Sequence, residues 1–403
     1  MNLYLVDNQF KPLPEWLLNN KGLIKIISSL ETDGGVVKLI GGAVRAIIRN
    51  DKKPENIDLV TDLTPDKIIK CLQKSKIKFF STNMKYGIIT AIFLDEKVEI
   101  STLRIDLKTF GRQANVKFSD SWLEDAKRRD FFLNAVYMDF SGNIYDPLNG
   151  IDDLKKGQVR FIGSALKRIS EDYLRMLRYV RFSSFYKNRK VNGDDISAIK
   201  ANIRNVSKLS KERIINELKS IFIDRDQSLI AAKIMRKTSL DKACFQSKFN
   251  TNNLNFIDDT GIEVDWLIRI FSLTYDNEDV LKKYPLSNKE RKYWNEINRR
   301  LTKDDIKKLL SKNWKVKAYQ IGKFAALKLA LALMSNIKIS NRIRELLDYN
   351  PPTFPVKAKH LIEKGFKPGK KLGKKLLQLE KIWCNSNFSL NKNNLLNFIN
   401  EDI

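Results

Sequence analysis

The pattern of apolar positions divides the chain near residue 150. Before that point, short runs rich in β-branched residues alternate with turns and predict strands. These strands are expected at residues 36–40, 57–60, 88–94, 98–100 and 134–140. After Gly150, apolar residues recur at the three- and four-residue spacing of helices, as in residues 173–182 and 324–334. The pattern therefore predicts an α+β protein, in which an N-terminal mixed sheet with flanking helices precedes a helical remainder.

Net charge changes at the same point as the apolar pattern. The 403 residues carry a formal charge of +27, of which residues 1–150 contribute only +3 and residues 151–403 contribute +24. A strongly basic surface attached to a nearly neutral unit is typical of a protein that binds a polyanion such as RNA. The alternative is a general drift toward Lys, Asn and Ile, but drift alone does not explain the neutral first 150 residues.

The rare residue types exclude several kinds of chemistry. With a single histidine, His360, catalysis that depends on imidazole is excluded, including Ser/His/Asp and Cys/His nucleophiles. The three cysteines lie far apart, which argues against a disulfide framework and a thiolate zinc site. No run approaches the ~18 apolar residues of a membrane span, and the first residues do not resemble a secretion signal. We therefore expect a cytoplasmic protein whose chemistry uses carboxylates, lysines, arginines and metal ions.

A glycine pair follows the first buried strand. Gly41 and Gly42 stand between residues 36–40 and an apolar-periodic stretch that includes Val44 and Ile47. Glycines at such a turn let a phosphate approach backbone N–H groups at the positive end of a helix, and Arg45 stands one turn further on. Taken alone, most such glycine pairs are simple turns.

Carboxylates on two later strands complete this pattern. In the strand that contains residues 56–60, the period of two places Asn56 and Asp58 on one face, and Glu99 lies in the strand at residues 98–101. Carboxylates on neighbouring strands beside a phosphate loop are the arrangement that holds Mg²⁺ in nucleotidyl transfer. The alternative, a pair of solvated strand carboxylates, would be favoured if these segments stood alone.

These segments belong to a longer series of motifs in a fixed order. The series consists of residues 41–45 (GGAVR), 56–65 (NIDLVTDLTP), 98–104 (VEISTLR), 128–135 (RRDFFLNA) and 171–178 (EDYLRMLR), with a tail motif at 365–373 (GFKPGKKLG). The series resembles the class II tRNA nucleotidyltransferase and bacterial poly(A) polymerase family, especially its CCA-adding members, most closely over residues 36–185. The resemblance implies a nucleotidyltransferase head with a polymerase-β-like mixed sheet, followed by an all-helical neck, body and tail.

The resemblance also implies roles for individual residues. Gly41, Gly42 and Arg45 would hold the triphosphate, and Asp58 would bind the catalytic Mg²⁺ with support from Asn56 and Glu99. The further residues expected at the incoming nucleotide are Arg129, Asp130, Asn134, Asp172, Arg175, Arg178 and Arg181. Among them, Asp130 would contact the ribose, and Asp172 and Arg175 would read the base without a nucleic-acid template. Residues 104–117 are expected to form a loop, which in relatives assists the switch between adding C and adding A; the alternative is a variable surface connection.

Asn56 departs from the family pattern, which has Asp-x-Asp where this chain has Asn56-Ile57-Asp58. An amide oxygen is a neutral and weaker ligand for a hard cation than a carboxylate. The site could turn over slowly on Asp58 and Glu99 with the Asn56 carbonyl as a ligand. The chain could instead be a noncatalytic RNA-binding relative, or Asn56 could reflect an alteration of the sequence at a position that was originally Asp.

The expected function is addition of C and A to the 3′ end of tRNA from CTP and ATP with Mg²⁺. A poly(A) polymerase, or an enzyme that adds only CC or only A, is the alternative within the family. The expected partner is tRNA or another RNA 3′ end, with neither DNA nor a membrane involved. We expect the head at residues 1–150, a neck with the base-reading helix at 151–225, and an RNA-binding body and tail at 226–403.

Overall fold

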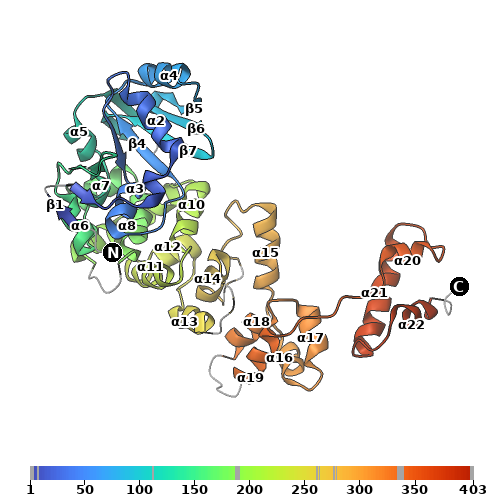
Figure 1. The fold of residues 1–403 in the computed structure, drawn as a ribbon. Helices are drawn as coiled ribbons and strands as arrows, with labels where there is room; N and C mark the ends of the chain where they lie inside the picture. Colours follow the sequence, from blue (N-terminus) through green and yellow to red (C-terminus); the bar gives the residue numbers. More distant parts are fainter. Residues whose placement is uncertain are drawn as a thin grey trace. The chain divides into compact units, whose positions relative to one another are not determined.

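The chain folds into two compact units, Met1–Lys248 and Phe249–Ile403. The structure is a computed structural model, and it describes residues 4–6, 9–110, 113–186, 191–259, 262, 264–275, 277, 279–333 and 340–399. Figure 1 shows a sheet with flanking helices near the N-terminus and helices throughout the second unit. The predicted α+β architecture is therefore confirmed.

The first unit is built on a seven-stranded sheet with the order β11-β10-β3-β4-β7-β6-β5. The pair β4 and β7 is parallel, and the other neighbouring pairs are antiparallel. The sheet strands are β3 (Val37–Ile40), β4 (Ile57–Thr61), β5 (Lys78–Asn83), β6 (Ile88–Phe93), β7 (Glu96–Thr102), β10 (Tyr137–Met138) and β11 (Ile144–Tyr145). Two separate hairpins are formed by β1 (Tyr4–Val6) with β2 (Gln9–Lys11), and by β8 (Arg104–Phe110) with β9 (Gln113–Phe118).

Helices complete the first unit and follow local sequence signals. Asn20, Ser121 and Ser210 accept hydrogen bonds from the first turns of their helices, and Pro65 begins another. The α-helices are α1 (Glu15–Leu18), α2 (Lys21–Glu31), α3 (Gly42–Arg49), α4 (Pro65–Lys74), α5 (Trp122–Lys127), α6 (Gly150–Lys156), α7 (Ala165–Glu171), α8 (Arg175–Ser184), α9 (Gly193–Ala201), α10 (Lys211–Ile221), α11 (Arg225–Thr238) and α12 (Leu240–Phe245). Three 3₁₀ turns are η1 (Met84–Tyr86), η2 (Phe132–Asn134) and η3 (Ile203–Lys208).

The second unit is helical in its described part. Its helices are α13 (Thr251–Asp259), α14 (Trp266–Leu273), α15 (Asn288–Asn298), α16 (Lys303–Leu310), α17 (Trp314–Ile321), α18 (Ala325–Ala332), α19 (Ser340–Leu347), α20 (Ala358–Ile362), α21 (Lys370–Asn385) and α22 (Lys392–Asn397). One apolar cluster includes Leu309, Trp314 and Leu329, and another is centred on Leu379 and Trp383. None of the described helices has the combination of length and apolarity that a membrane span needs.

Two expectations about strands are corrected by the structure. The strand expected at 134–140 is reduced to Tyr137–Met138, because Asn134 belongs to a 3₁₀ turn. The segment expected as a loop at 104–117 forms the paired strands β8 and β9, with residues 111 and 112 outside the described part. Leu107 and Phe118 of this hairpin are 62% and 38% exposed, so these two apolar side chains do not mark a buried face, which is the usual sequence signal of a strand.

Candidate active site

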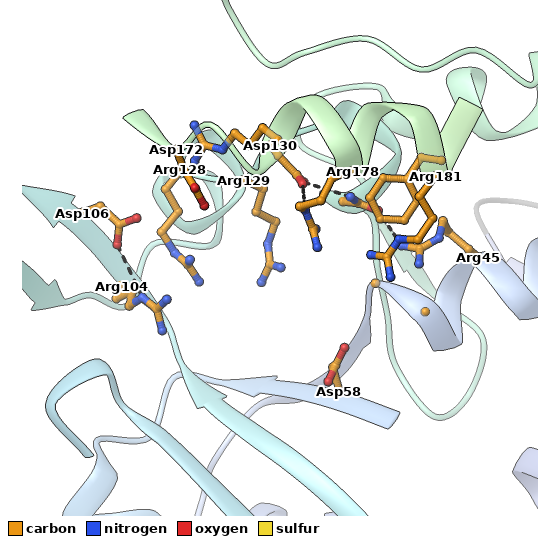
Figure 2. Close-up of a pocket in the computed structure, with 15 residues that line it drawn as sticks. Arg45, Asp58, Arg104, Asp106, Arg128, Arg129, Asp130, Asp172, Arg178 and Arg181 are labelled. Atoms are coloured by element: carbon orange, nitrogen blue, oxygen red, sulfur yellow. Dashed lines mark hydrogen bonds and ion pairs between the residues drawn. The ribbon is translucent and has the colours of Figure 1, made fainter. Parts of the chain in front are cut away.

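A polar cavity of about 450 Å³ lies within the first unit, beside the turn from β3 to α3. It is lined by Gly41, Gly42, Arg45, Asp58, Arg104, Asp106, Arg128, Arg129, Asp130, Asn134, Asp172, Arg175, Arg178, Arg181 and Phe182. Figure 2 shows arginines from several elements directed into the space above the strand that carries Asp58. Seven arginines and four aspartates form this lining, so positive charge is in excess, which suits an anionic ligand.

The turn between β3 and α3 requires glycine at its first position. Gly41 has a φ of +64°, a backbone conformation that other residues rarely adopt, and a Cβ there would meet Oδ2 of Asp58 at 3.5 Å. No side chain caps the N-terminus of α3. The N–H groups of its first turn are therefore available to an anion from the cavity.

Asp58 lies at the centre of the sheet beside a second carboxylate. Its register places it opposite Ile40 of β3 and opposite Glu99 of β7, so Asp58 and Glu99 share one face. Burial, followed by the negative charge of Glu99, raises the pKa of the Asp58 carboxyl, and Arg129 and Arg45 oppose this shift. A cation between the two carboxylates would relieve their repulsion, and oxygen donors of this kind fit a hard divalent ion.

Asn56, the second predicted metal ligand, is placed differently from Asp58. Asn56 is exposed and precedes the first residue of β4, and Glu99 is also exposed; neither lines the cavity. Among the described residues, no three His, Cys, Asp or Glu side chains are grouped so that they could hold a metal ion. The charged donors at this position are therefore the pair Asp58 and Glu99.

Arg45 differs from the other arginines of the cavity because no carboxylate pairs with it in the described structure. Its Nη1 donates to Oδ1 of Asn134, and its guanidinium lies 4.7 Å from the ring centre of Phe182. Burial and the nearby charges of Arg181 and Arg178 lower the pKa of Arg45 to about 10. A bound anion would favour the charged form that the surroundings now disfavour.

Asp130 is fixed by three donors at the side of the cavity. Nε of Arg178 donates to Oδ2 at 2.6 Å, whereas Nδ2 of Asn134 and the Phe131 N–H donate to Oδ1 at 2.9 and 3.0 Å. Burial opposes ionisation of Asp130, but the charge of Arg178 outweighs it and holds the pKa of this carboxyl well below its usual range. Asp130 is therefore an ionised, oriented hydrogen-bond acceptor.

The residues expected to read the base are held by side chains from α10 and α7. Arg213 of α10 donates to both oxygens of Asp172, at 3.0 and 2.7 Å. Arg175 pairs with Glu171 at 2.6 Å, and Arg181 pairs with Glu217 of α10 at 2.8 Å. Because each of these side chains has a charged partner, their donors and acceptors keep fixed directions.

Comparison with known proteins identifies the family of this chain. The family profile of the Poly A polymerase head domain matches residues 37–160. The human protein named CCA tRNA nucleotidyltransferase 1, mitochondrial, is 30% identical over 396 residues, covering 95% of this chain and 90% of the relative. The chain belongs to the CCA tRNA nucleotidyltransferase family.

Other CCA tRNA nucleotidyltransferases agree in sequence and fold. The CCA-adding enzyme of Lactobacillus helveticus is 35% identical over 194 residues, which is 48% of this chain and 47% of the relative. The solved structure of the Bacillus stearothermophilus CCA-adding enzyme in complex with CTP has a TM-score of 0.69 at 22% identity, covering 90% of this chain and 92% of that chain. Nucleotidyltransferases of this family generally use a divalent metal.

The structure brings together the nucleotide-binding residues predicted by resemblance to the CCA tRNA nucleotidyltransferases. Those residues all line the cavity, and so does Asp58, whereas Asn56 and Glu99 do not. Their individual roles stay predictions. The prediction omitted four lining residues, which are Arg104, Asp106, Arg128 and Phe182.

Sequence offered a signal for some of the omitted residues. Arg128 directly precedes Arg129, and Phe182 lies on the helix of the EDYLRMLR motif, so both could have been included. Arg104 and Asp106 belong to the hairpin that was expected to be a loop, where they pair at 3.5 Å. Arg213 and Glu217 are far from their partners in sequence, and only the packing of α10 against α8 brings them close.

Proposed function

We propose that this protein adds C and A to the 3′ end of tRNA from CTP and ATP, with Mg²⁺ as the divalent ion. The observation that carries the proposal is the arginine-rich cavity above Asp58, in which Arg45 lacks a carboxylate partner among the described residues. A nucleoside triphosphate supplies the missing negative charge. The names of the relatives specify the transfer of nucleotides to tRNA.

In the proposed reaction, the RNA 3′ oxygen attacks the α-phosphorus of the nucleotide. A new P–O bond forms as the 3′ hydroxyl loses its proton to solvent. The bond between the α-phosphorus and the oxygen that bridges it to the β-phosphate breaks, and pyrophosphate leaves with the electron pair. Asp58 would hold Mg²⁺ with support from Glu99 and Asn56, and the ion when bound stabilises negative charge on the attacking and leaving oxygens. Gly41, Gly42 and Arg45 would bind the triphosphate, and positioning would supply much of the rate enhancement.

The remaining cavity residues would select and orient the nucleotide. Asp130, held ionised by Arg178, is placed to accept a hydrogen bond from a ribose hydroxyl. Asp172 and Arg175 offer an acceptor and donors, which can satisfy the edge that cytosine and adenine share. The division at residues 150 and 225, the RNA-binding role of 226–403 and a cytoplasmic location also stay proposals.

The proposed function is tested by nucleotide incorporation. Purified protein is incubated with tRNA lacking its 3′ terminal nucleotides, Mg²⁺ and labelled CTP or ATP, beside the Asn56→Asp variant. We expect incorporation that stops after the CCA end is complete, whereas continued addition of A would identify a poly(A) polymerase. Addition of C alone or of A alone would identify a partial enzyme.

The Asn56→Asp arm decides whether the metal site is disabled. Activity in both forms supports turnover on Asp58 and Glu99, with a gain of about tenfold at limiting Mg²⁺ expected from the added charge. Activity in Asn56→Asp alone would identify a disabled site. No incorporation by either form, together with tight tRNA binding, would leave the noncatalytic RNA-binding alternative.

A further inference from the structure

Asp125 of α5 is a buried carboxylate behind the cavity. Its side chain is fully buried and does not line the cavity, yet it contacts three residues that do: the side chains of Arg128 and Arg129, and the backbone N–H of Arg104 at 3.4 Å. Oδ1 accepts from Nε and Nη2 of Arg128 at 2.9 and 2.6 Å, and Oδ2 accepts from Nε and Nη2 of Arg129 at 3.2 and 2.8 Å. Each guanidinium therefore uses its Nε–Nη2 edge on one oxygen of Asp125.

Because each arginine binds Asp125 through Nε and Nη2, the Nη1 group of each remains for a ligand. Nη1 of Arg128 and Nη1 of Arg129 have no hydrogen-bond partner among the described residues. Figure 2 shows both guanidinium groups directed into the cavity. Two cations share one anion, so the group keeps a net positive charge, which suits phosphate oxygens.

Tyr137 anchors this group to the sheet. Its hydroxyl donates to Oδ2 of Asp125 at 2.8 Å, and its ring centre lies 5.5 Å from the Arg129 guanidinium. Tyr137 is fully buried in β10 and pairs with Ile40, the residue before the glycine turn. Through Tyr137, Asp125 and the two arginines are thus held against β3, the strand that leads into the glycine turn.

The positive charges of Arg128 and Arg129 keep the Asp125 carboxyl ionised. Burial alone would favour the protonated carboxyl, but Arg129 and Arg128 outweigh it and hold the pKa of Asp125 well below its usual range. An ionised, fully buried carboxylate keeps its geometry because every displacement leaves a charge unpaired. Loss of that charge would place two arginines side by side without a counter-ion.

We propose that Asp125 is a positioning residue that orients Arg128 and Arg129 to bind phosphate oxygens in the cavity. The proposal rests on the proposed function, because the phosphate belongs either to the incoming nucleotide or to the RNA 3′ end. Asp125 does not line the cavity, so it would act on the phosphate through the side chains of Arg128 and Arg129.

The test compares Asp125→Asn with a matched buried carboxylate. Asp153 is 2% exposed, accepts from Nε of Arg160 at 3.0 and 3.1 Å, and lies outside the cavity, so Asp153→Asn controls for loss of stability. Binding of CTP and ATP is measured by calorimetry without RNA, and KM and kcat are measured for nucleotide and tRNA. Melting temperature is recorded for every variant.

We expect Asp125→Asn to weaken nucleotide binding about ten- to hundredfold, the range for lost charged hydrogen bonds. KM for nucleotide should rise more than kcat falls, while Asp153→Asn changes only the melting temperature. In the variant with both Arg128→Ala and Arg129→Ala, adding Asp125→Asn should cause no further loss. A rise in KM for tRNA in place of nucleotide would also support the role and assign the phosphate to RNA.

Other outcomes of these measurements separate the positioning role of Asp125 from the proposed function. If Asp125→Asn does not fold, Tyr137→Phe tests the same group, and we expect a loss of about threefold in affinity from one hydroxyl. Unchanged affinity and KM in the folded variants would overturn the positioning role alone. A wild-type protein that binds neither CTP nor ATP would overturn the proposed function, and this role with it.

Discussion

At the residue scale, the cavity is organised by how each cation is paired. Arg178, Arg181 and Arg175 each face a carboxylate at 2.6 to 2.8 Å, and these pairs fix their direction. Arg45 has only the neutral amide of Asn134 and the ring of Phe182. Arg45, one turn after the glycine pair, is thus the cavity arginine whose charge is not balanced by a carboxylate among the described residues.

Replacing Arg45 should therefore weaken nucleotide binding selectively. In Arg45→Ala we expect KM for CTP and ATP to rise about ten- to hundredfold, because charged hydrogen bonds to the triphosphate are lost. Affinity for tRNA should change less than twofold. Arg49→Ala is the control, since Arg49 lies on the same helix, pairs with Asp51 and does not line the cavity. Equal effects of the two substitutions would argue against a triphosphate role for Arg45.

At the element scale, α10 supports the expected base-reading residues, of which Asp172 stands at the end of α7 in extended backbone and Arg175 begins α8. Arg213 holds Asp172 through two hydrogen bonds, and Glu217 holds Arg181. Neither α10 residue lines the cavity. The direction of the base-reading groups is thus set by a helix that follows them by about 40 residues in sequence.

Loss of Arg213 should relax the choice of nucleotide. In Arg213→Met we expect incorporation of U or G to rise about tenfold relative to C and A, since Asp172 can then turn away from its reading position. Glu212→Gln is the control, because Glu212 is exposed on the same helix. Competition assays with all four labelled nucleotides measure the ratio. If Arg213→Met slows all four nucleotides equally, α10 contributes to stability and not to selection.

The sequence predicted the parts of the site that lie within single motifs. Gly41, Gly42 and Arg45 adjoin one turn, and Arg175 and Arg178 stand at helical spacing on α8, so local pattern was enough for them. The same spacing did not predict that the backbone is extended at Asp172, between α7 and α8. Asp125 and Arg213 were missed because their importance comes from partners that only the folded chain brings into contact. The β8–β9 hairpin was missed because its apolar residues Leu107 and Phe118 are exposed and the segment shows no clear apolar period of two.

A second prediction at this scale concerns helix α9, which carries a buried acid. Burial, with a further contribution from the negative charge of Asp194, raises the pKa of Asp195 to about 6, and a hydrogen bond from Tyr179 and the charge of Arg160 oppose this shift. The folded state therefore holds the proton more tightly than the unfolded state, and the resulting stabilisation is lost as the pH rises from about 4 to 6.

The Asp195→Asn variant should remove this pH dependence. We expect it to be more stable than the wild type at pH 7 by about 1 to 2 kcal/mol, with the difference vanishing near pH 4. Urea unfolding at pH 4, 5, 6 and 7 measures the difference. Glu212→Gln on α10 is the control, because Glu212 is exposed and is not among the charges that shift the pKa of Asp195. A constant difference across this pH range would contradict the assignment.

At the scale of the whole molecule, the charge of +27 is concentrated outside the sheet region. One basic hollow of about 380 Å³ lies at the end of α11 and in α12, lined by Lys233, Arg236, Lys237, Ser239, Asp241, Lys242 and Lys248. Its lysines and its arginine are exposed and form no ion pair with a described residue. Unpaired cations gathered in this way favour contact with RNA phosphates.

Reversing charge in this hollow should weaken tRNA binding in a salt-dependent manner. For Lys233→Glu with Lys237→Glu, we expect an affinity loss of at least about tenfold at low salt. The slope of log affinity against log salt should become shallower by about 1.5, because two phosphate contacts are lost. Lys67→Glu with Lys70→Glu on α4 makes the same change in net charge at exposed positions of the sheet region. If both pairs shift the slope equally, tRNA responds to total charge, whereas a shift confined to the α11 pair places the RNA backbone at this hollow.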